Sequence, residues 1–467
     1  MSNIFDLLVI GAGPAGLAAA ATAAKLGLSV TLIDEQPAPG GQIHRGIESR
    51  TVQASSVSYA DDARGAALVV EFRSCGAQYL SGTQVWQMEP DRKVYITDGT
   101  RTFCIQAKRV LIAVGAMERP VPIPGWTLPG VMTVGAAQIR YKTTGWLPPN
   151  GTNGTNGTWL AGSGPLLWLY AAQVIEAGGC VAGILDTTPR SNYTQALRYA
   201  AGALRNHGYL IRGRALQNTV RKAGVRVVQD VLALEAQGDG QVSRVRYRVG
   251  DTWCDEAAAM VLLHQGVVPH VHASRSIGAQ HRWDALQRAF APETDAWGNL
   301  GVEGYAAAGD CAGIVGAEAS ALQGRLTALE AARALGVINE QQRNNEAAPM
   351  RAELARHLPV RPFLDQLFAP RASLLAPGDD VLVCRCESIT ARQLRDAVKL
   401  GAMGPNQVKA FTRCGMGPCQ GRLCGLATAE IIAVARGVSM AETGVFNVRP
   451  PLKPLSLSEL AALEGEP

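Results

Sequence analysis

The sequence predicts an α/β protein with two dinucleotide-binding (Rossmann-like) domains, the second inserted in the first, and a small helical domain near the C-terminus. Three observations lead to this prediction. A glycine-rich turn follows an apolar stretch near residue 11, a similar pattern recurs near residue 162, and five of the ten cysteines fall within residues 384–424. Strands that alternate with helices are typical of parallel sheets.

Length and composition agree with several ordered domains. At roughly 150 residues per domain, 467 residues suggest about three domains. Hydrophobic residues make up 47% of the chain and charged residues 18%, which excludes disorder as the main state. The net charge is +5 and the basic residues are scattered, so we expect no nucleic-acid partner.

The sequence predicts neither a membrane span nor a targeting signal. The nearest candidate span, residues 159–175, is broken near its start by Gly162, Gly164 and Pro165. The first eleven residues lack a basic n-region and a cleavage site. We therefore expect a cytoplasmic protein with reduced thiols, whose cysteines are ligands or core residues rather than disulfides.

The N-terminal segment has the order of elements that a dinucleotide site requires. Residues 5–10 are expected to form a buried strand, residues 17–26 a helix, and residues 29–33 a second strand that ends at Asp34 and Glu35. A GxGxxG turn lies between the first strand and the helix. One of the two acids is expected to accept hydrogen bonds from ribose hydroxyls, and their charge disfavours a 2′-phosphate.

Each glycine of the turn Gly11-Ala12-Gly13-Pro14-Ala15-Gly16 has a physical role. Gly11 permits the tight turn, Gly13 lets backbone amides approach a pyrophosphate, and Gly16 lets the helix pack closely on the strand. The positive end of the helix dipole then faces the phosphates. This context favours a nucleotide site over a chance match.

Two distant segments favour FAD as the nucleotide. Residues 110–116 and residues 305–310 are expected to be strands that end in small residues, the second at Gly309-Asp310. In flavoproteins with two dinucleotide domains, the Asp of such a pair hydrogen-bonds the ribityl chain. The alternative is that Asp310 only caps the helix expected at residues 320–333. Gly40-Gly41-Gln42 either lines the flavin or forms a plain loop.

The second glycine-rich pattern departs from the first. In Gly162-Ser163-Gly164-Pro165-Leu166-Leu167 the third glycine is replaced by Leu167, which would hold helix and strand apart. A strand at residues 181–185 then ends at Asp186. Residues 116–268 are therefore expected to have NAD(P)-binding architecture, with the site either empty or holding another nucleotide. Residues 152–158 are expected to form a surface loop.

The clustered cysteines predict a metal centre. Cys384 and Cys386 form a C-x-C pair, and Cys414, Cys419 and Cys424 give two overlapping C-x4-C pairs. Four thiolates suit zinc or an iron–sulfur cluster, and the one-residue spacing of the first pair is unusual for zinc. On the spacing alone, either Cys414 with Cys419 or Cys419 with Cys424 could complete the set.

Other candidate ligands are expected to be structural. The remaining cysteines stand singly, Cys311 next to Asp310 included, and are expected to be small core residues. No CxxC lies beside the nucleotide sites, so a dithiol relay is not expected. His270 and His272 have metal-type spacing but no carboxylate nearby, so a structural role is favoured.

These motifs together resemble a known family. The N-terminal GAGPAG, residues 116–120, residues 124–131, the Gly-Asp at 309–310 and the C-terminal GMGPCQGR at 415–422 carry the resemblance. They are similar to those of the FAD-containing alpha-type subunits of heteromeric amine dehydrogenases and oxidases. That group includes subunits of D-hydroxyproline dehydrogenase, opine oxidase and hydrogen cyanide synthase. Residues 379–440 resemble the bacterioferritin-associated-ferredoxin type of 2Fe–2S domain.

The resemblance implies specific cofactors and ligands. It implies FAD and a 2Fe–2S cluster, and it leaves open an FMN at a subunit interface and a nucleotide in the second domain. The implied cluster ligands are Cys384, Cys386, Cys419 and Cys424, with Cys414 as the competing choice. The residues expected to bind FAD are Gly11, Gly13, Pro14, Ala15, Gly16, Asp34, Glu35, Gly41, Gln42, Ala113, Gly115, Gly309 and Asp310. No catalytic residue is assigned.

The resemblance also implies the partners and the reaction. A separate beta subunit, similar to D-amino-acid oxidases, would oxidise a D-hydroxyproline-like or opine-like amine, with a small ferredoxin-like subunit sometimes present. This chain would accept the electrons and pass them on, in the cytoplasm or at the inner membrane through its partners. Two alternatives remain: a self-sufficient NAD(P)H-dependent flavin reductase, and a non-catalytic iron–sulfur protein with a vestigial flavin fold.

The expected domain boundaries follow from these assignments. Residues 1–115 and 269–345 would form a discontinuous FAD domain around the inserted 116–268 domain. A proline-containing connector at 346–378 would lead to the cluster domain at 379–440. The tail at 441–467 is expected to lie extended, because its Pro450-Pro451 pair is incompatible with regular helix.

Overall fold

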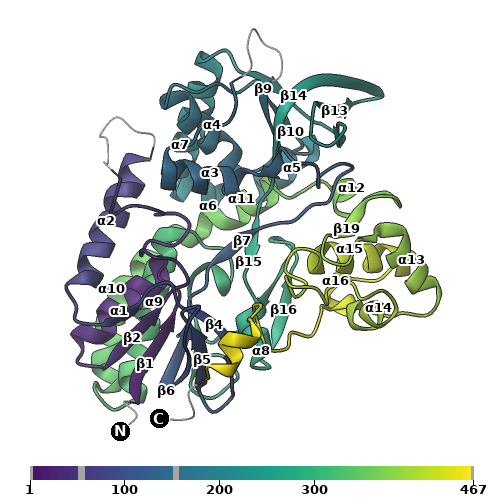
Figure 1. Cartoon of the computed structure of the whole chain (residues 1–467). Coiled ribbons are helices and arrows are strands. Elements are labelled where there is room, and N and C mark those ends of the chain that lie inside the picture. The colour runs from purple at the N-terminus through teal and green to yellow at the C-terminus, as the bar shows by residue number, and fades with distance from the viewer. Residues whose placement is uncertain (1–3, 51–57, 151–156, 464–467) are drawn as a thin grey trace.

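The computed structural model describes residues 4–50, 58–150 and 157–463. Two lobes, each built on a seven-stranded sheet, are joined by a narrow connection, and a smaller helical unit lies beside that connection (Figure 1). The predicted loop at 152–158 falls largely outside the described residues. No helix in the described part of the chain is long and apolar enough to span a bilayer.

The first sheet is mainly parallel, as the alternating pattern predicts. Its order is β3-β2-β1-β6-β5-β4, with β18 beside β6. Strands β1, β2, β3, β6 and β18 run parallel to one another, and β4 and β5 add a hairpin that pairs antiparallel with β6. The bounds are β1 Phe5–Ile10, β2 Val30–Ile33, β3 Gln78–Leu80, β4 Gln84–Met88, β5 Lys93–Thr97, β6 Thr102–Ile112 and β18 Tyr305–Ala307.

Helices cover one face of this sheet. Alternate strand residues such as Leu7, Val9 and Leu111 pack against α1 (Pro14–Lys25), α2 (Tyr59–Arg73) and α9 (Ala317–Ala334). The helices are rich in alanine, so they approach closely. A Cβ added to Gly324 of α9 would lie 2.1 Å from the carbonyl oxygen of Ala15 in α1. Segments far apart in the sequence are thereby brought together behind the glycine turn.

The second sheet repeats this plan. Its order is β11-β10-β9-β14-β13-β12, with β8 beside β14. Helices α3, α4 and α7 cover one face, and Leu167, the residue in place of the third glycine, is buried in the core between them and the sheet. The bounds are β8 Val131–Thr133, β9 Gly157–Ser163, β10 Gly183–Asp186, β11 Arg226–Val228, β12 Ala233–Gln237, β13 Arg244–Val249, β14 Thr252–Gln265, α3 Val134–Thr144, α4 Pro165–Glu176 and α7 His207–Lys222.

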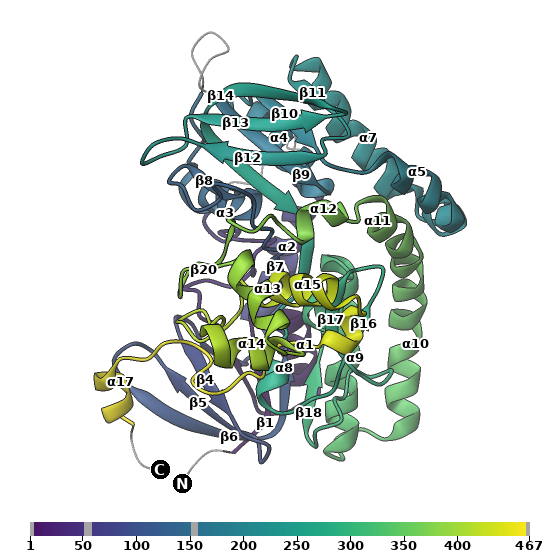
Figure 2. The same cartoon turned by 90° about the vertical axis from the view of Figure 1, so that its right-hand side faces the viewer.

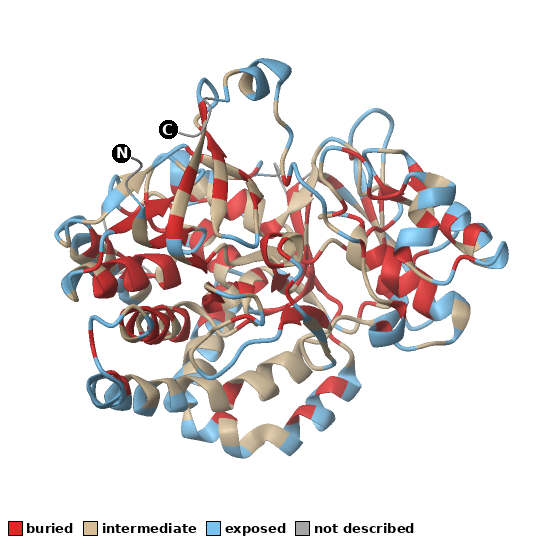
Figure 3. Ribbon diagram, turned by 90° about the horizontal axis from the view of Figure 1, so that it is seen from below, coloured by how far each residue is buried: buried red, intermediate tan, exposed pale blue. Residues whose placement is uncertain are grey.

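An antiparallel ribbon joins the two lobes. Strand β7 (Ala116–Glu118) leaves the first sheet and pairs with β15 (Val267–Pro269), which returns to it. Both strands run through the middle of the molecule (Figure 1). Buried residues, drawn in red, concentrate in the interior of the molecule, and exposed residues lie at its edges (Figure 3). Beyond β15 come α8 (His272–Ser276) and the hairpin β16 (His281–Asp284)–β17 (Ala289–Pro292).

The C-terminal unit is small and largely helical. It contains β19 Leu382–Cys384, β20 Ile389–Thr390, α13 Ala391–Lys399, α14 Pro405–Thr412, α15 Gly425–Arg436 and α16 Met440–Thr443. Thr390 is the N-cap residue of α13 and forms a capping box with Gln393. The unit is docked on the rest of the chain, because Arg288 forms an ion pair with the buried Glu430 at 2.8 Å and Trp126 Nε1 donates to the Leu382 carbonyl at 2.7 Å.

The segment expected to be a connector is helical for much of its length. Helix α10 (Glu340–His357) runs through the predicted boundary at 345/346 and contains Pro349. It continues into η3 (Leu358–Val360), α11 (Arg361–Leu367) and α12 (Ala372–Leu375), which climb from the first lobe to the second (Figure 2). The tail is irregular from residue 444 to 456, as expected, and then forms α17 (Leu457–Ala461).

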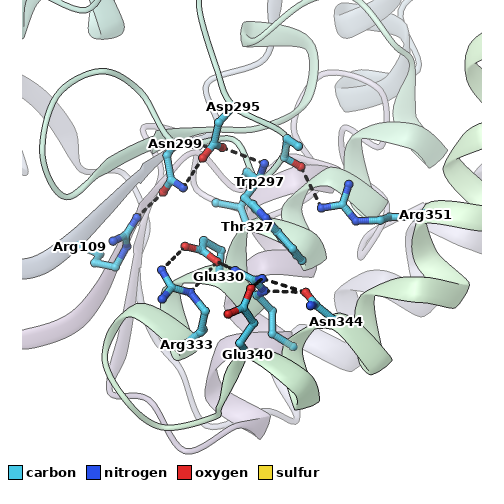
Figure 4. Close-up of polar contacts among 12 residues, drawn as sticks. Arg109, Asp295, Trp297, Asn299, Thr327, Glu330, Arg333, Glu340, Asn344 and Arg351 are labelled. Atoms are coloured by element: carbon cyan, nitrogen blue, oxygen red, sulfur yellow. Dashed lines mark hydrogen bonds and ion pairs between the residues drawn. The ribbon is translucent and has the colours of Figure 1, made fainter.

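A buried charge network ties α9 to α10 (Figure 4). Glu330 accepts hydrogen bonds from Arg333 and Arg343, both at 2.6 Å, and the side chains of Glu330 and Arg343 are only 6% and 8% exposed. Burial disfavours the charged form of Glu330, but the hydrogen bonds and positive charges of the two guanidinium groups outweigh this effect. The pKa of Glu330 is therefore lowered. Trp297 lies under Arg343, with 4.0 Å from the guanidinium carbon to the ring centroid.

Candidate functional site

The three glycines of the first turn occupy positions with different steric demands. Gly11 has φ +106°, and a Cβ there would lie 2.5 Å from the Ala113 carbonyl oxygen. A Cβ on Gly16 would lie 1.8 Å from the Gly11 carbonyl oxygen, so helix and strand touch through it. At Gly13 the nearest atom would be 4.0 Å away. Gly13 therefore leaves open space at the start of α1, where a phosphate can approach the backbone.

The start of α1 leaves backbone donors available. Gly13 is the N-cap residue and provides no side-chain hydrogen bond, and Pro14 occupies the first turn, where its missing N–H is not needed. Ala15 and Gly16 follow, both buried. The uncapped amides and the helix dipole together suit an anion.

The structure distinguishes the two acids at the end of β2. Asp34 accepts hydrogen bonds from the amides of Ala12, at 2.5 Å, and Gln36, at 2.6 Å, so its carboxylate lies against the glycine turn. Burial raises the pKa of Asp34 despite these bonds. Glu35 is exposed and forms an ion pair with Lys453 of the tail.

The Gly40-Gly41-Gln42 segment lies against the same turn. The Gly40 amide donates to the Ala12 carbonyl at 2.9 Å, and a Cβ on Gly41 would lie 2.8 Å from the Gly13 Cα. Just beyond, the buried Lys142 donates from Nζ to the Ile43 carbonyl at 2.7 Å. Burial lowers the pKa of this lysine to about 8.

The ends of β6 and β18 complete this side of the first sheet. Ala113 and Gly115 follow β6, and Gly309 follows β18 with its amide donating to Gln323 Oε1 at 3.0 Å. Asp310 Oδ1 accepts from the amides of Val315, at 2.8 Å, and Gly316, at 2.9 Å, just before α9. One carboxylate oxygen of Asp310 thus accepts hydrogen bonds from the amides that precede α9, as the helix-capping alternative predicts.

Cys311 is a core residue rather than a nucleophile. Its side chain is buried, and its thiol lies 3.2 Å from the Ile112 carbonyl oxygen. Burial raises the pKa of the thiol to about 11, so it stays protonated at neutral pH.

The expected FAD residues therefore converge at the carboxyl end of the first sheet. The open position at Gly13, the uncapped helix start and the acid at the end of β2 fit a dinucleotide with a pyrophosphate.

The clustered cysteines also converge. The thiols of Cys384, Cys414 and Cys424 are buried and lie within 4.8 Å of one another. Hydrogen bonds from Cys414 and Cys424 lower the pKa of Cys384 to about 2. Cys419 interacts with Cys424, which lowers its pKa to about 5, and also with Cys386. Thiols gathered in this way are suited to bind a metal centre as thiolates.

Backbone geometry brings the cysteine loops together. Cys384 ends β19, and Cys424 is the N-cap residue of α15. A Cβ on Gly417 would lie 2.2 Å from the Cys386 Cβ, so only glycine permits this approach. Cys414, which the resemblance leaves out of the ligand set, lies in the tight group, whereas Cys386 is exposed.

Sequence reasoning missed a loop that links the two sites. The backbone amide of His270 donates to the Gly115 carbonyl at 3.0 Å, and the His272 Nε2 lies 3.0 Å from the Gln420 carbonyl oxygen. Gln420 follows Cys419 in the cysteine cluster. The His270 Nδ1 is buried with no hydrogen-bond partner among the described residues. The two histidines thus connect the chain just after β6 to the loop that carries Cys419, and no metal is needed to explain their spacing.

The second glycine turn is crowded by a histidine. A Cβ on Gly162 would lie 1.6 Å from the His264 carbonyl oxygen, and a Cβ on Gly164 would lie 2.9 Å from its Nε2. The ring of His264 is fixed by Glu118, whose carboxylate is 2.7 Å from Nδ1. The ring therefore fills space next to the second glycine, where a phosphate would need to approach.

The connector covers the same turn. Ser163 Oγ donates to the Phe368 carbonyl at 3.3 Å, and Asn192 Nδ2 donates to the carbonyls of Leu367 and Ala369, at 3.1 and 3.0 Å. Arg371 Nε donates to the Thr187 carbonyl at 3.3 Å, just beyond β10. The second site is thus occupied from two sides by the chain's own residues.

Comparisons with known proteins agree with this geometry. The family model described as pyridine nucleotide-disulphide oxidoreductase matches residues 5–145, and that of the sarcosine oxidase A3 domain matches residues 381–464. The L-proline dehydrogenase of P. horikoshii superposes with a TM-score of 0.71 at 18% identity, covering 98% of this chain and 80% of that one. Fold and first site define an FAD-dependent oxidoreductase.

Relatives narrow this class to one family. The opine oxidase A-type protein of Rhizobium meliloti (strain 1021) is 40% identical over 99% of both chains, and that of Agrobacterium tumefaciens (strain Ach5) is 41% identical over 99% of this chain and 92% of its own length. The hydrogen cyanide synthase subunit HcnB of Pseudomonas aeruginosa is 29% identical over 98% of this chain and 99% of its own. The chain belongs to the family of opine oxidase A subunits.

Proposed function

We propose that this chain is the electron-transfer subunit of a heteromeric amine dehydrogenase or oxidase. The relatives named as subunits of opine oxidase and hydrogen cyanide synthase support a multi-subunit assembly. The substrate would be a secondary amine of the opine or D-hydroxyproline type, oxidised on a partner subunit similar to D-amino-acid oxidases. An FMN at a subunit interface, a small ferredoxin-like partner and a cytoplasmic location remain further predictions.

In this proposal the chain's own residues hold two redox groups. The turn from Gly11 to Gly16 and the Asp34 carboxylate would hold FAD, and the clustered thiolates a 2Fe–2S cluster. A bound flavin exchanges two electrons, singly or as a pair, and a 2Fe–2S cluster carries one. The half-buried Arg422 adds positive charge near Cys419, which offsets the negative charge of thiolates.

One observation carries the proposal: a single short loop contacts both sites. Residues 270–272 bond to Gly115 at the flavin side and to Gln420 in the cysteine loop. The Arg288–Glu430 ion pair also holds the C-terminal unit against the β16–β17 hairpin. Such rigid docking suits electron exchange between the two sites better than it suits a mobile binding module.

The main alternative is a self-sufficient NAD(P)H-dependent reductase. It needs a nicotinamide nucleotide at the second glycine turn. His264 crowds Gly164 there, and the connector bonds to Ser163, so the contacts of the described residues count against it. A hydrogen cyanide synthase subunit is a variant of the same proposal, with a different amine.

The ligand set of the cluster can be tested separately. The family-type set predicts that Cys424→Ser loses iron, whereas Cys414→Ser keeps two irons per chain. Thr428 Oγ1 lies 3.4 Å from the Cys414 thiol, and a serine hydroxyl there can keep this contact. Iron analysis, together with electron paramagnetic resonance (EPR) of the reduced protein, distinguishes the two ligand sets. Loss of iron in Cys414→Ser alone would place Cys414 among the ligands.

The function itself is tested with the purified chain and its partner subunits under anaerobic conditions. The isolated chain, loaded with FAD, should not be reduced by the amine or rapidly by NADH or NADPH. Addition of the amine-oxidising partner should allow the amine to bleach the flavin absorption. Rapid bleaching of the isolated chain by NADH would contradict the proposal and support the reductase.

A further inference from the structure

The helices that follow β10 carry a long segment without carboxylates. Between Asp186 and Asp230 the sequence has eight Lys or Arg residues and no Asp or Glu, although 39 of the 467 residues are acidic. Because neutral residues separate most of these basic residues, the segment contains no long run of consecutive basic residues. The segment comprises α5 (Arg190–Ala196), η1 (Leu197–Tyr199), α6 (Ala200–Arg205) and α7. It lies at the outer side of the second lobe (Figure 2).

Large apolar side chains are exposed on the same helices. Tyr193, Leu197, Leu204 and Ile211 are 50%, 65%, 67% and 63% exposed. The backbone is helical at Ala196 and Leu197, where α5 passes into η1, and departs from helical values at Tyr199 (φ −106°, ψ 8°), just before α6. At about 100° per residue, Tyr193 and Leu197 then fall within about 40° of arc. Leu204 and Ile211 continue the series of exposed apolar side chains on α6 and α7.

Basic side chains lie beside these apolar side chains. On the first helix of this segment, Arg190 and Arg198 fall within about 80° of arc next to Tyr193 and Leu197, and Arg205 directly follows Leu204 in α6. The buried residues Asn192 and Ala196 lie on the opposite side of the first helix, where Asn192 bonds to the connector, and Ala203 is the buried residue of α6. The first helix thus has one face fixed to the chain and one exposed face that is half apolar and half basic.

Much of this positive charge is unpaired. Three arginines reach carboxylates elsewhere: Arg190 pairs with Asp230, Arg212 with Asp61, and Arg226 with Glu256. The rest form no ion pair within the described part of the chain: Arg198, Arg205, Arg214, Arg221 and Lys222. All five are exposed. Such a surface is complementary to a dense layer of negative charge.

We propose that the face formed by Tyr193, Leu197, Leu204 and the flanking arginines docks on the surface of an anionic phospholipid bilayer. Lysine or arginine beside apolar side chains on one helix face is the pattern of interfacial helices, in which apolar groups enter between headgroups and cations meet phosphates. This inference does not depend on the proposed redox function.

Vesicle flotation of the full-length purified chain tests the proposal. Vesicles of phosphatidylcholine with about one third phosphatidylglycerol should carry the chain upward at physiological salt, and pure phosphatidylcholine vesicles should not. High salt should release most of the bound chain because the attraction is screened. Absence of flotation with anionic vesicles, or equal flotation with neutral ones, overturns the proposal.

Paired variants locate the contact. Leu197→Ser with Leu204→Ser should weaken vesicle binding about tenfold or more, since apolar side chains no longer enter the bilayer. Leu400→Ser with Met403→Ser is the matched control, because these side chains are similarly exposed on the C-terminal unit, and it should bind as wild type. Melting curves should match for all variants. If the Leu197/Leu204 variant binds vesicles normally but no longer assembles with its partner subunits, the face is a protein interface and the proposal is wrong.

Discussion

The open position at Gly13 allows cofactor binding to be separated from folding. Gly13 has φ −79° and ψ −176°, which any residue adopts, and an added Cβ would be 4.0 Å from its nearest neighbour. Gly13→Ala should therefore change the stability of the FAD-free protein little. The gain from a stiffer unfolded chain, ~0.4–1 kcal/mol, is offset by the poorer N-cap.

The same methyl group should obstruct the pyrophosphate. It occupies the space through which phosphate oxygens approach the first amides of α1. Loss of one hydrogen bond to a charged group costs ~1.5–3 kcal/mol, which corresponds to a roughly 10–150-fold higher Kd for FAD. Titration of the deflavinated protein with FAD, followed by fluorescence quenching, measures this change. A thermal melt of the apoprotein measures the stability.

Gly16→Ala is the control with the opposite expectation. Its Cβ would lie 1.8 Å from the Gly11 carbonyl oxygen, so strand and helix must move apart and the apoprotein should be destabilised by about 1–3 kcal/mol. If Gly13→Ala binds FAD as tightly as the wild type, the pyrophosphate does not lie at this turn and the assignment of the site is refuted.

Three further predictions concern the stability of the fold and the loop at residues 270–272, which contacts both sites. Glu330→Ala should destabilise the fold by about 3–5 kcal/mol, because it leaves Arg343 buried without its partner; a urea midpoint close to that of wild type would contradict this. Burial lowers the pKa of His44 and of His281 to about 4, below the ~6.5 of an unfolded chain. The unfolded chain therefore binds more protons between these values, so stability should be full above pH 6.5 and fall as the pH drops toward 4, by at most about 3 kcal/mol for each group; urea midpoints that are flat over this range would refute the prediction. His272→Phe removes the contact to the cysteine loop and should alter the EPR line shape of the reduced protein at unchanged iron content, whereas an identical spectrum would show that the contact has no influence.

Locally encoded features could be predicted from the sequence. The first glycine turn is specified by positions where only glycine fits, such as Gly11 and Gly16, and these demands lie within a few residues of the chain. The capping box at Thr390 is equally local. The Gly-Asp at 309–310 was also recognisable, but its contact to the start of α9 supports the capping alternative as well.

Contacts between distant segments could not be predicted. Ser163 and Phe368 are 205 residues apart, and nothing in either segment indicates that one covers the other. The prolines led to the prediction of a connector at 346–378, yet Pro349 stands inside α10 and Pro362 in the first turn of α11, where proline is tolerated. The position of Cys414 among the thiols depends on the packing of two loops, which the spacing of cysteines leaves open.

The central claim is that one chain holds a flavin and a thiolate-bound iron pair for electron transfer. The most direct measurement is EPR of the anaerobically purified chain after reduction with dithionite, with iron and flavin determined on the same sample. The account predicts one FAD, two irons and about one unpaired spin per chain, with the signal of a reduced 2Fe–2S cluster. A protein that contains zinc in place of iron, or that gives no such signal at full flavin content, would contradict it.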